Sequence, residues 1–183
     1  MNIPYLPISG KSELKHTSTW LALYGGFTYH TLVENQSGNE FLKSRLRNGS
    51  DVDRTYESLH NVGKRSDFPT ITRLEAKGGI YTDTDTIAPQ PIDSWIPARL
   101  RHSTRLVAGI EFDQHDSMPP ENIPHPFQFA QWTIASALGH PVLRMMIACV
   151  HVSVEDRERQ HGLDETELRP TNFEVLNSTG PAA

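Results

Sequence analysis

Along this chain, segments in which apolar and polar residues alternate, as in a strand, are interspersed with segments whose apolar residues have helical spacing. This order constrains the fold more than any other feature of the sequence. Alternating or β-branched residues, bounded by Gly, Pro and Asn, predict strands over 27–33, 80–87 and 106–112. Apolar residues at helical spacing predict helices over 37–47, 51–60, 66–77, 127–138 and 141–150. Because strands that alternate with helices are typical of a sheet covered by helices, we predict an α/β domain with a mostly parallel central sheet.

Proline and glycine set the expected ends of two helices. Ser66 is expected to cap one helix, because Pro69 then falls in the first turn, where its missing N–H does little harm. Gly78 and the glycine after it are expected to end that helix. Pro141 is expected at the first position of the last helix, directly after the Gly139 that ends the helix predicted over 127–138.

Length and charge narrow the classes of function. The 183 residues fit one domain, and we expect an irregular segment over 1–19 followed by a single domain over 20–183. The 17 Lys and Arg against 22 Asp and Glu give a net charge of −5, so no basic surface attracts a nucleic acid or an anionic membrane. No apolar run approaches the roughly 18 residues of a membrane span, and the first residues lack the pattern of a signal peptide. We therefore expect no nucleic-acid partner and no membrane span in this chain.

The single cysteine and the charged stretch near the end give two structural expectations. One cysteine allows no intrachain disulfide and no zinc site of several cysteines. Cys149 lies in an apolar run and is expected to be a buried structural thiol. Residues 155–167 are strongly charged and are expected to be solvated, and His151 and His161 are expected on the surface.

An acidic pair within the second predicted strand is the sequence feature that points to chemistry. On an extended segment residues i and i+2 point to the same side, so Asp83 and Asp85 can converge on one cation. Two carboxylates at the end of a strand suit Mg²⁺ or Mn²⁺, which completes its shell with water and ligand phosphate. Because the cation neutralises charge on a leaving diphosphate, the pair points to a diphosphate ligand. For a lone Asp-x-Asp tripeptide, a solvated turn is the alternative.

Further blocks stand around this pair in a fixed order. They are Arg65-Ser66-Asp67, Gly78-Gly79-Ile80-Tyr81, Pro91-Ile92-Asp93-Ser94-Trp95, Gln131-Trp132-Thr133-Ile134, Gly139-His140-Pro141 and Ser178-Thr179-Gly180-Pro181. By these motifs and their spacing, the chain resembles the Asp-x-Asp sugar transferases of glycosyltransferase family 32 from Trp20 to Pro181. Within that family it is most similar to the fungal initiation-specific α-1,6-mannosyltransferases.

The resemblance implies a GT-A type nucleotide-sugar-binding fold and retaining transfer of a hexose. The expected reaction moves mannose from GDP-mannose onto a glycan acceptor, the outer chain of an N-glycan in the Golgi. By carry-over, the metal ligands for Mn²⁺ or Mg²⁺ are Asp83 and Asp85, and the donor-binding residues are Asp67, Gly79, Tyr81, Asp83 and His140. No nucleophile is assigned, because attack guided by the leaving phosphate needs no dedicated protein base.

Departures from the family pattern keep other interpretations open. Thr70 stands where relatives carry Arg, which removes a cation that could orient Asp67 or pair with phosphate. The first strand and a later Trp- and Asp-containing segment of the family are also not found, so we expect a fold truncated at both ends. The alternatives are a remnant that keeps the fold without turnover, and another activity of the family such as galactosyl transfer or mannosylation of a sphingolipid.

Several single residues allow two interpretations each. His140 either contacts the donor phosphate or caps a helix. Trp132 is expected to pack in the core. Tyr81 either stacks on the nucleotide or packs under the sheet edge. Glu111 and Asp113 lie where acceptor-side acids could lie, with a solvated strand end as the alternative.

Overall fold

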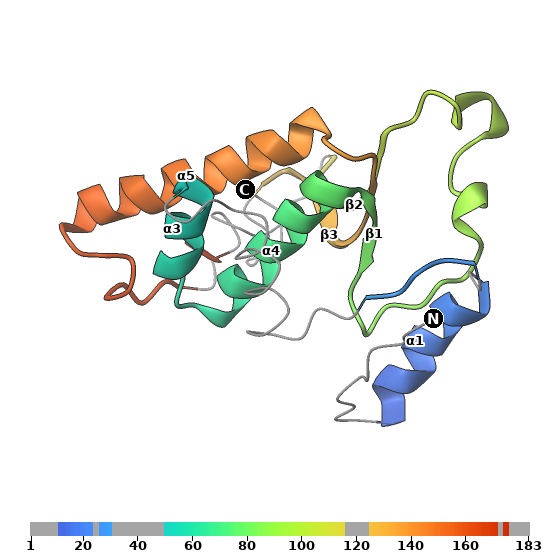
Figure 1. Cartoon of the computed structure of the whole chain (residues 1–183), viewed down its shortest axis with the longest axis horizontal. Helices are drawn as coiled ribbons and strands as arrows, with labels where there is room; N and C mark the ends of the chain where they lie inside the picture. Colours follow the sequence, from blue (N-terminus) through green and yellow to red (C-terminus); the bar gives the residue numbers. More distant parts are fainter. Residues whose placement is uncertain (1–10, 24–25, 31–49, 116–124, 172–173, 176–183) are drawn as a thin grey trace. The chain divides into compact units, whose positions relative to one another are not determined.

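The computed structural model describes residues 11–23, 26–30, 50–115, 125–171 and 174–175 (Figure 1). In chain order its elements are α1 (Lys11–Leu23), α3 (Asp51–Ser58), α4 (Val62–Lys77), β1 (Gly79–Thr82), two 3₁₀ helices (Ile92–Ser94 and Ala98–Leu100), β2 (Leu106–Asp113), β3 (Phe127–Ser136) and α5 (Pro141–His161). The chain divides into two compact units, Met1–Leu32 with Thr82–Arg105, and Val33–Tyr81 with Leu106–Ala183. The helix predicted over 37–47 and the last block at 178–181 lie outside the described residues.

The first unit is built on α1 and the long segment after β1. Part of the irregular segment expected over 1–19 is helical, because α1 begins at Lys11, after the prolines of the opening. Trp20 near the end of α1 forms a small buried cluster with Ala88. Of the strand predicted over 27–33, residues 27–30 are described, and they form a bend and an irregular stretch.

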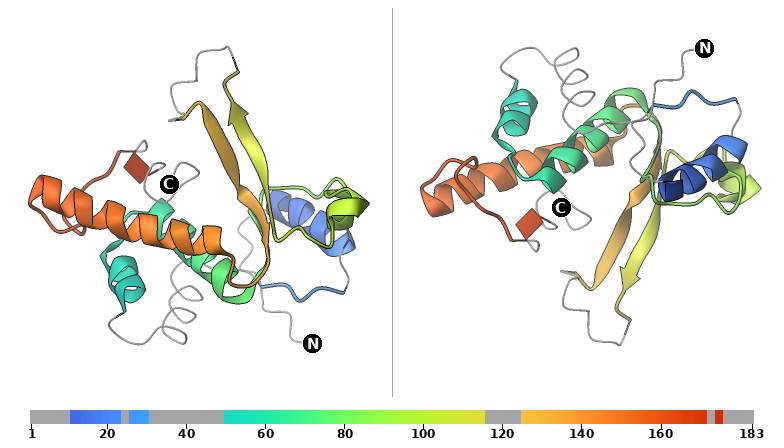
Figure 2. Two further views of the ribbon diagram at one scale, coloured as in Figure 1. Left: turned by 90° about the horizontal axis from the view of Figure 1, so that it is seen from above. Right: turned by 90° about the horizontal axis from the view of Figure 1, so that it is seen from below.

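The second unit contains a three-stranded sheet in which β3 lies between β1 and β2. β2 and β3 run antiparallel, with Leu106 opposite Ser136 and Asp113 opposite Phe127 (Figure 2). The α/β class is confirmed, whereas this sheet differs from the mostly parallel one that the sequence predicts. Parallel neighbours need a crossover connection, usually a helix, and residues 127–136, expected within such a helix, form β3 instead.

The apolar residues of β3 lie at helical spacing, but the segment is a strand. Its buried positions alternate with less buried ones, as in a strand, before and after an irregularity in its pairing with β2. The buried side chains are Gln128, Ala130, Ile134 and Ser136. The register with β2 shifts between Ala108 and Ile110, so residues 130–133 lie where the regular pairing is interrupted. Trp132 in this stretch is 40% exposed, contrary to the packed position expected for it.

Of the second unit's described helices, α3, α4 and α5 form its core with the sheet. The side chains of the first cluster are Tyr56, Leu59, Phe68, Val150 and Val154, and those of the second are Ile71, Leu74, Ile134 and Leu143. The first cluster joins α3, α4 and α5, and the second joins α4, α5 and β3 (Figure 1). The helix predicted over 51–60 and its apolar stripe are therefore confirmed as α3. Among the described residues, no helix combines the length and apolarity that crossing a bilayer requires.

α4 begins earlier than predicted. Its N-cap is Asn61, whose side chain accepts a hydrogen bond from the backbone N–H of Lys64, so the expected cap at Ser66 is wrong. Pro69 lies inside the helix rather than in its first turn. The predicted end at Gly78 is confirmed.

α5 starts with Pro141 at its first turn, as predicted. Its buried side chains, which include Val150 and Val154, lie on one stripe of the helix. Cys149 is exposed, so the expectation of a buried thiol is wrong. A continuous apolar run in a helix reaches all faces of the helix, whereas only one stripe of α5 is buried. Cys149 lies outside that stripe.

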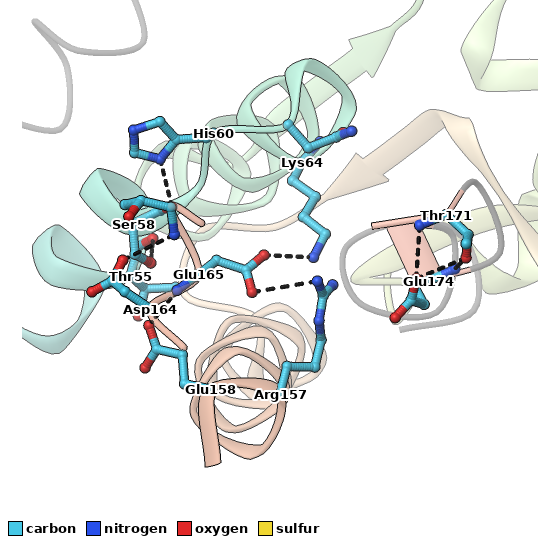
Figure 3. Close-up of polar contacts among 12 residues, drawn as sticks. Thr55, Ser58, His60, Lys64, Arg157, Glu158, Asp164, Glu165, Thr171 and Glu174 are labelled. Atoms are coloured by element: carbon cyan, nitrogen blue, oxygen red, sulfur yellow. Dashed lines mark hydrogen bonds and ion pairs between the residues drawn. The ribbon is translucent and has the colours of Figure 1, made fainter. Parts of the chain in front are cut away.

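A buried ion cluster joins α4, α5 and the segment after α5 (Figure 3). Lys64 is fully buried, and its Nζ donates to Glu165 Oε1 at 2.9 Å. Arg157 places Nη2 3.5 Å from Glu165 Oε2. The stretch 155–167 is therefore not solvated throughout, because Arg157 and Glu165 are buried. His151 is half-buried, with Nδ1 2.8 Å from the hydroxyl of Thr55.

The glycine that ends α4 is required by its surroundings. Gly78 has φ of 65°, and a Cβ there would lie 2.7 Å from the backbone nitrogen of Leu138. We expect Gly78→Ala to lower the free energy of unfolding by about 1 to 3 kcal/mol, because it adds both strain and a backbone clash. Gly162→Ala is the matched control, because Gly162 also has positive φ but open space for a Cβ. Urea unfolding measures both, and equal losses would refute the clash.

Candidate functional site

The acidic pair lies in a turn that follows β1. The strand ends at Thr82, so Asp83 and Asp85 do not share the face of an extended strand as predicted. Asp83 is half-buried and Asp85 is exposed. Turn-forming Asp and Thr side chains compete with the strand ladder here, and this competition explains the difference.

Two threonine hydroxyls close this turn. Thr86 donates to the carbonyl oxygen of Asp83 twice, from its backbone N–H at 3.2 Å and from its Oγ1 at 2.6 Å. The hydroxyls of Thr82 and Thr86 also form a hydrogen bond with each other. The Asp83 carbonyl is thus occupied by hydrogen bonds within the turn.

The donor set of the pair fits a hydrated divalent cation. In the part of the chain that the structure describes, no group of three or more His, Cys, Asp or Glu is arranged to hold a metal. Mg²⁺ and similar ions, however, are often bound by one or two carboxylates and keep waters and substrate phosphates as their other ligands. Asp83 and Asp85 supply that number of carboxylates from one short turn.

Two of the predicted donor residues lie on β1. Gly79 has φ of 109°, and a Cβ built there meets nothing within 4 Å among the described atoms. A ligand therefore has room to approach the backbone at this position. Tyr81 is half-buried and packs against the cluster that contains Ile71 and Leu74, which supports the packing alternative for this ring.

His140 caps α5. Its Nδ1 accepts a hydrogen bond from the backbone N–H of Val142 at 3.3 Å, which confirms the capping interpretation. Next to it, the N–H of Gly139 donates to the carbonyl of Glu75 at 2.8 Å, and Arg144 Nε donates to Glu75 Oε1 at 2.7 Å. These bonds hold the start of α5 at the end of α4, beside the corner that leads into β1.

Asp67 lies apart from these residues. It is half-buried on α4, eleven residues before Gly78, which corresponds to about 16 Å along the helix axis. The structure therefore brings His140 to the Gly78 corner but leaves Asp67 about three turns away along the helix. Asp83 and Asp85 belong to the first compact unit, and the other predicted donor residues belong to the second.

The two acids considered for the acceptor side lie on β2. Glu111 is half-buried, and its Oε2 accepts a hydrogen bond from Gln128 Nε2 at 2.7 Å. Asp113 is exposed, and its Oδ1 accepts from the backbone N–H of His115 at 3.3 Å. Sequence reasoning missed the pairing of Glu111 with Gln128, because it treated 127–138 as a helix.

The structure also reveals residues that support the acidic turn and that the sequence did not single out as functional. Trp20 and Thr19, at the end of α1, both form hydrogen bonds to the segment after the acidic pair. Their partners lie 66 and 69 residues away along the chain, so no local sequence pattern could have revealed them.

Comparison with known proteins finds a matching family model and a similar solved structure. Residues 10–101, half of the chain, match the family model described as the glycosyltransferase sugar-binding region containing the DXD motif. That range includes the acidic turn, α1 and α4. A search of solved structures finds similarity to the PaToxG glycosyltransferase, with 14% identity, a TM-score of 0.40, and coverage of 80% of this chain and 60% of that one.

Curated relatives are fungal enzymes. The initiation-specific α-1,6-mannosyltransferase of Candida albicans is 28% identical over 93% of this chain and 46% of its own length. The initiation-specific α-1,6-mannosyltransferase of Schizosaccharomyces pombe is 30% identical over 93% of this chain and 42% of its own. The chain thus spans less than half the length of these relatives. It belongs to the glycosyltransferase family whose sugar-binding region contains the DXD motif.

Proposed function

We propose that this chain acts in a retaining glycosyltransferase that moves mannose from GDP-mannose onto a glycan. Membership of the DXD family supports the reaction class, and the activity named for the relatives supports an α-1,6-mannosyl product. The observation that carries the proposal is the turn that presents Asp83 and Asp85 within the matched region. The acceptor is the outer chain of an N-glycan, and the compartment is the Golgi.

We assign the metal to the acidic turn. The carboxylates of Asp83 and Asp85 would hold Mn²⁺ or Mg²⁺, an ion that usually keeps water and substrate phosphate as its other ligands. Held there, a divalent cation would supply positive charge to offset the negative charge that develops on a leaving diphosphate. The half-buried Asp83 also serves the donor, whereas the exposed Asp85 serves the metal alone.

The other donor contacts come from α4, β1 and the start of α5. Gly79 offers open space beside the backbone, and the capping His140 keeps its second ring nitrogen, Nε2, for a donor oxygen. Tyr81 supports β1 from the core side. We further propose that residues 20–183 belong to one GT-A type catalytic domain.

Transfer to an oligomannose N-glycan tests this function. The protein is incubated with Mn²⁺, the glycan and either GDP-mannose or UDP-galactose, and the product linkage is determined by proton NMR. The account predicts an α-1,6-linked mannose with retained configuration and no galactosyl product. An inverted product, galactosyl transfer, or no transfer by the folded protein would contradict it, and the last result would favour a remnant without turnover.

Asp67 gives a narrower prediction. We expect Asp67→Asn to weaken GDP-mannose binding about tenfold, because a hydrogen bond to a charged group contributes roughly 1.5 to 3 kcal/mol. Glu57→Gln is the control, because Glu57 is an exposed acid on the neighbouring α3. Calorimetric titration measures both variants, and a dissociation constant for Asp67→Asn equal to that of the control would remove Asp67 from the donor site.

A further inference from the structure

The end of α1 is bonded to the segment that follows the acidic pair. Trp20 donates its indole Nε1–H to the backbone carbonyl of Thr86 at 3.2 Å. The preceding residue, Thr19, accepts a hydrogen bond at its Oγ1 from the backbone N–H of Ala88 at 2.9 Å. Two consecutive side chains of one helix therefore hold the backbone on both sides of Ile87. Figure 2 shows α1 beside this segment in both views.

The indole that makes this bond is itself fixed in place. Trp20 is 6% exposed and packs with Ala88 in the small core of the first unit. Its ring meets Trp95 edge-to-face, with centroids 6.1 Å apart and an interplanar angle of 84°. Its backbone carbonyl accepts a hydrogen bond from the Tyr29 hydroxyl at 3.0 Å. Because the buried ring is held on several sides, its N–H points in one direction.

Thr86 connects this indole to the acidic pair. The residue that accepts from Trp20 is the same one that closes the turn by donating twice to the Asp83 carbonyl. It also directly follows Asp85 in the chain. The contacts thus run without a gap from Trp20 through Thr86 to Asp83, all within one compact unit. The position of Thr86 therefore sets the backbone from which both carboxylates project.

We propose that Trp20 is a positioning residue for the Asp83 and Asp85 carboxylates, acting through the Thr86 carbonyl. This inference rests on the metal role assigned to the pair in the proposed function. A metal site binds well when the groups around its ligands fix their orientation, and loss of such a supporting group typically costs about 10 to 100-fold in affinity. In this role Trp20 acts through Thr86 and needs no contact with the cation or the donor. By holding Thr86, it determines the fraction of time in which both carboxylates point toward one cation.

The test uses the same substitution at two neighbouring tryptophans. Trp20→Phe keeps an aromatic ring in the cluster but removes the N–H that bonds Thr86, and Trp95→Phe changes the same cluster without removing a described bond to the turn. Mn²⁺ binding is measured by the electron paramagnetic resonance signal of the free ion. We expect the dissociation constant for Mn²⁺ to rise about tenfold in Trp20→Phe and less than about twofold in Trp95→Phe.

Two further variants distinguish failure of the proposed metal site from failure of the positioning role alone. Asp85→Asn should weaken Mn²⁺ binding strongly, and adding Trp20→Phe to it should cause little further loss. If Asp85→Asn binds Mn²⁺ normally, the metal site and this inference both fail. If Asp85→Asn loses binding while Trp20→Phe equals Trp95→Phe, only the positioning role is overturned. Should Trp20→Phe not fold, Thr19→Val removes the second bond to the segment and is expected to weaken Mn²⁺ binding in the same direction.

Discussion

If the proposed function holds, we expect Asp83→Ala and Asp85→Ala each to lower metal-dependent release of GDP from GDP-mannose by more than about 100-fold, in the range seen when a group that stabilises developing charge is removed. Each change deletes one of the two carboxylates that the turn offers to a cation. The diphosphate then leaves without a counter-charge held by the protein. The closing bonds of the turn use the Asp83 carbonyl and the Thr86 backbone and hydroxyl, so neither substitution removes them.

The control for this prediction is an acid of the same unit that has no part in the turn. Asp93 is exposed in the 3₁₀ helix Ile92–Ser94, and Asp93→Ala should release GDP at the rate of the unchanged protein. Circular dichroism and thermal unfolding confirm that all three variants are folded. An Asp85→Ala protein with full Mn²⁺-dependent turnover would contradict the assignment of the pair.

Glu165→Ala lowers the free energy of unfolding by about 3 to 5 kcal/mol, the usual cost of removing one partner from a buried ion pair. Lys64 is fully buried, and Glu165 is the carboxylate that its Nζ contacts, at 2.9 Å (Figure 3). Without that carboxylate, two buried cations remain, Lys64 and Arg157. Glu167→Ala, at an exposed acid two residues later, should change the free energy of unfolding by less than about 0.5 kcal/mol.

A double variant distinguishes lost pairing from lost packing. Lys64→Met with Glu165→Leu replaces the pair by apolar side chains of similar size, and it should recover part of the stability that Glu165→Ala loses, because Arg157 still lacks the carboxylate that it faces. Urea unfolding provides the measurement. A double variant as unstable as Glu165→Ala would show that the loss does not come from the unpaired charge of Lys64.

The buried pair of Lys64 and Glu165 also predicts how the free energy of unfolding changes with pH. Burial, the largest cause, holds the pKa of Lys64 below its ordinary value of 10.5. The unfolded chain therefore binds more protons than the folded one between the lowered pKa and 10.5, so this residue makes stability rise with pH in that window. Lys64→Met should remove this rise, measured as the difference in the free energy of unfolding between neutral and alkaline pH.

Local signals in the sequence predicted the helices well where one buried stripe dominates. Val52, Tyr56 and Leu59 lie at helical spacing, and they form or line the core with α4 and α5. Pro141 marked the start of α5, because its missing N–H and fixed φ suit a first helical position. β2 was predicted as a strand from its continuous apolar and β-branched residues.

The wrong predictions share a cause. The local sequence allows two structures, and contacts with residues far away along the chain decide between them. Residues 127–136 have apolar spacing that fits a helix, but β2 offers a ladder of backbone partners and the segment becomes β3. Glu165 looked solvated by composition, and only the fold brings Lys64 to it from a position 101 residues away. Cys149 lies in an apolar run that exceeds the width of the buried stripe of α5.

The motif of the candidate site can be recognised in the sequence, whereas the geometry of the site cannot. The Asp-x-Asp pair and the glycines before it are a sequence motif, whereas its turn depends on the hydroxyls of Thr82 and Thr86. The support from Trp20 depends on a contact between distant segments. A motif therefore predicts which atoms meet a ligand, and the fold determines what holds them.

Calorimetric titration of GDP-mannose into the protein, with and without Mn²⁺, tests the central claim most directly. The account predicts binding that requires the metal and that disappears in Asp85→Ala while Asp93→Ala behaves as the unchanged protein. Binding of GDP-mannose that is equally strong without a divalent cation, or that survives in Asp85→Ala, would contradict the claim that this turn holds the donor through a metal.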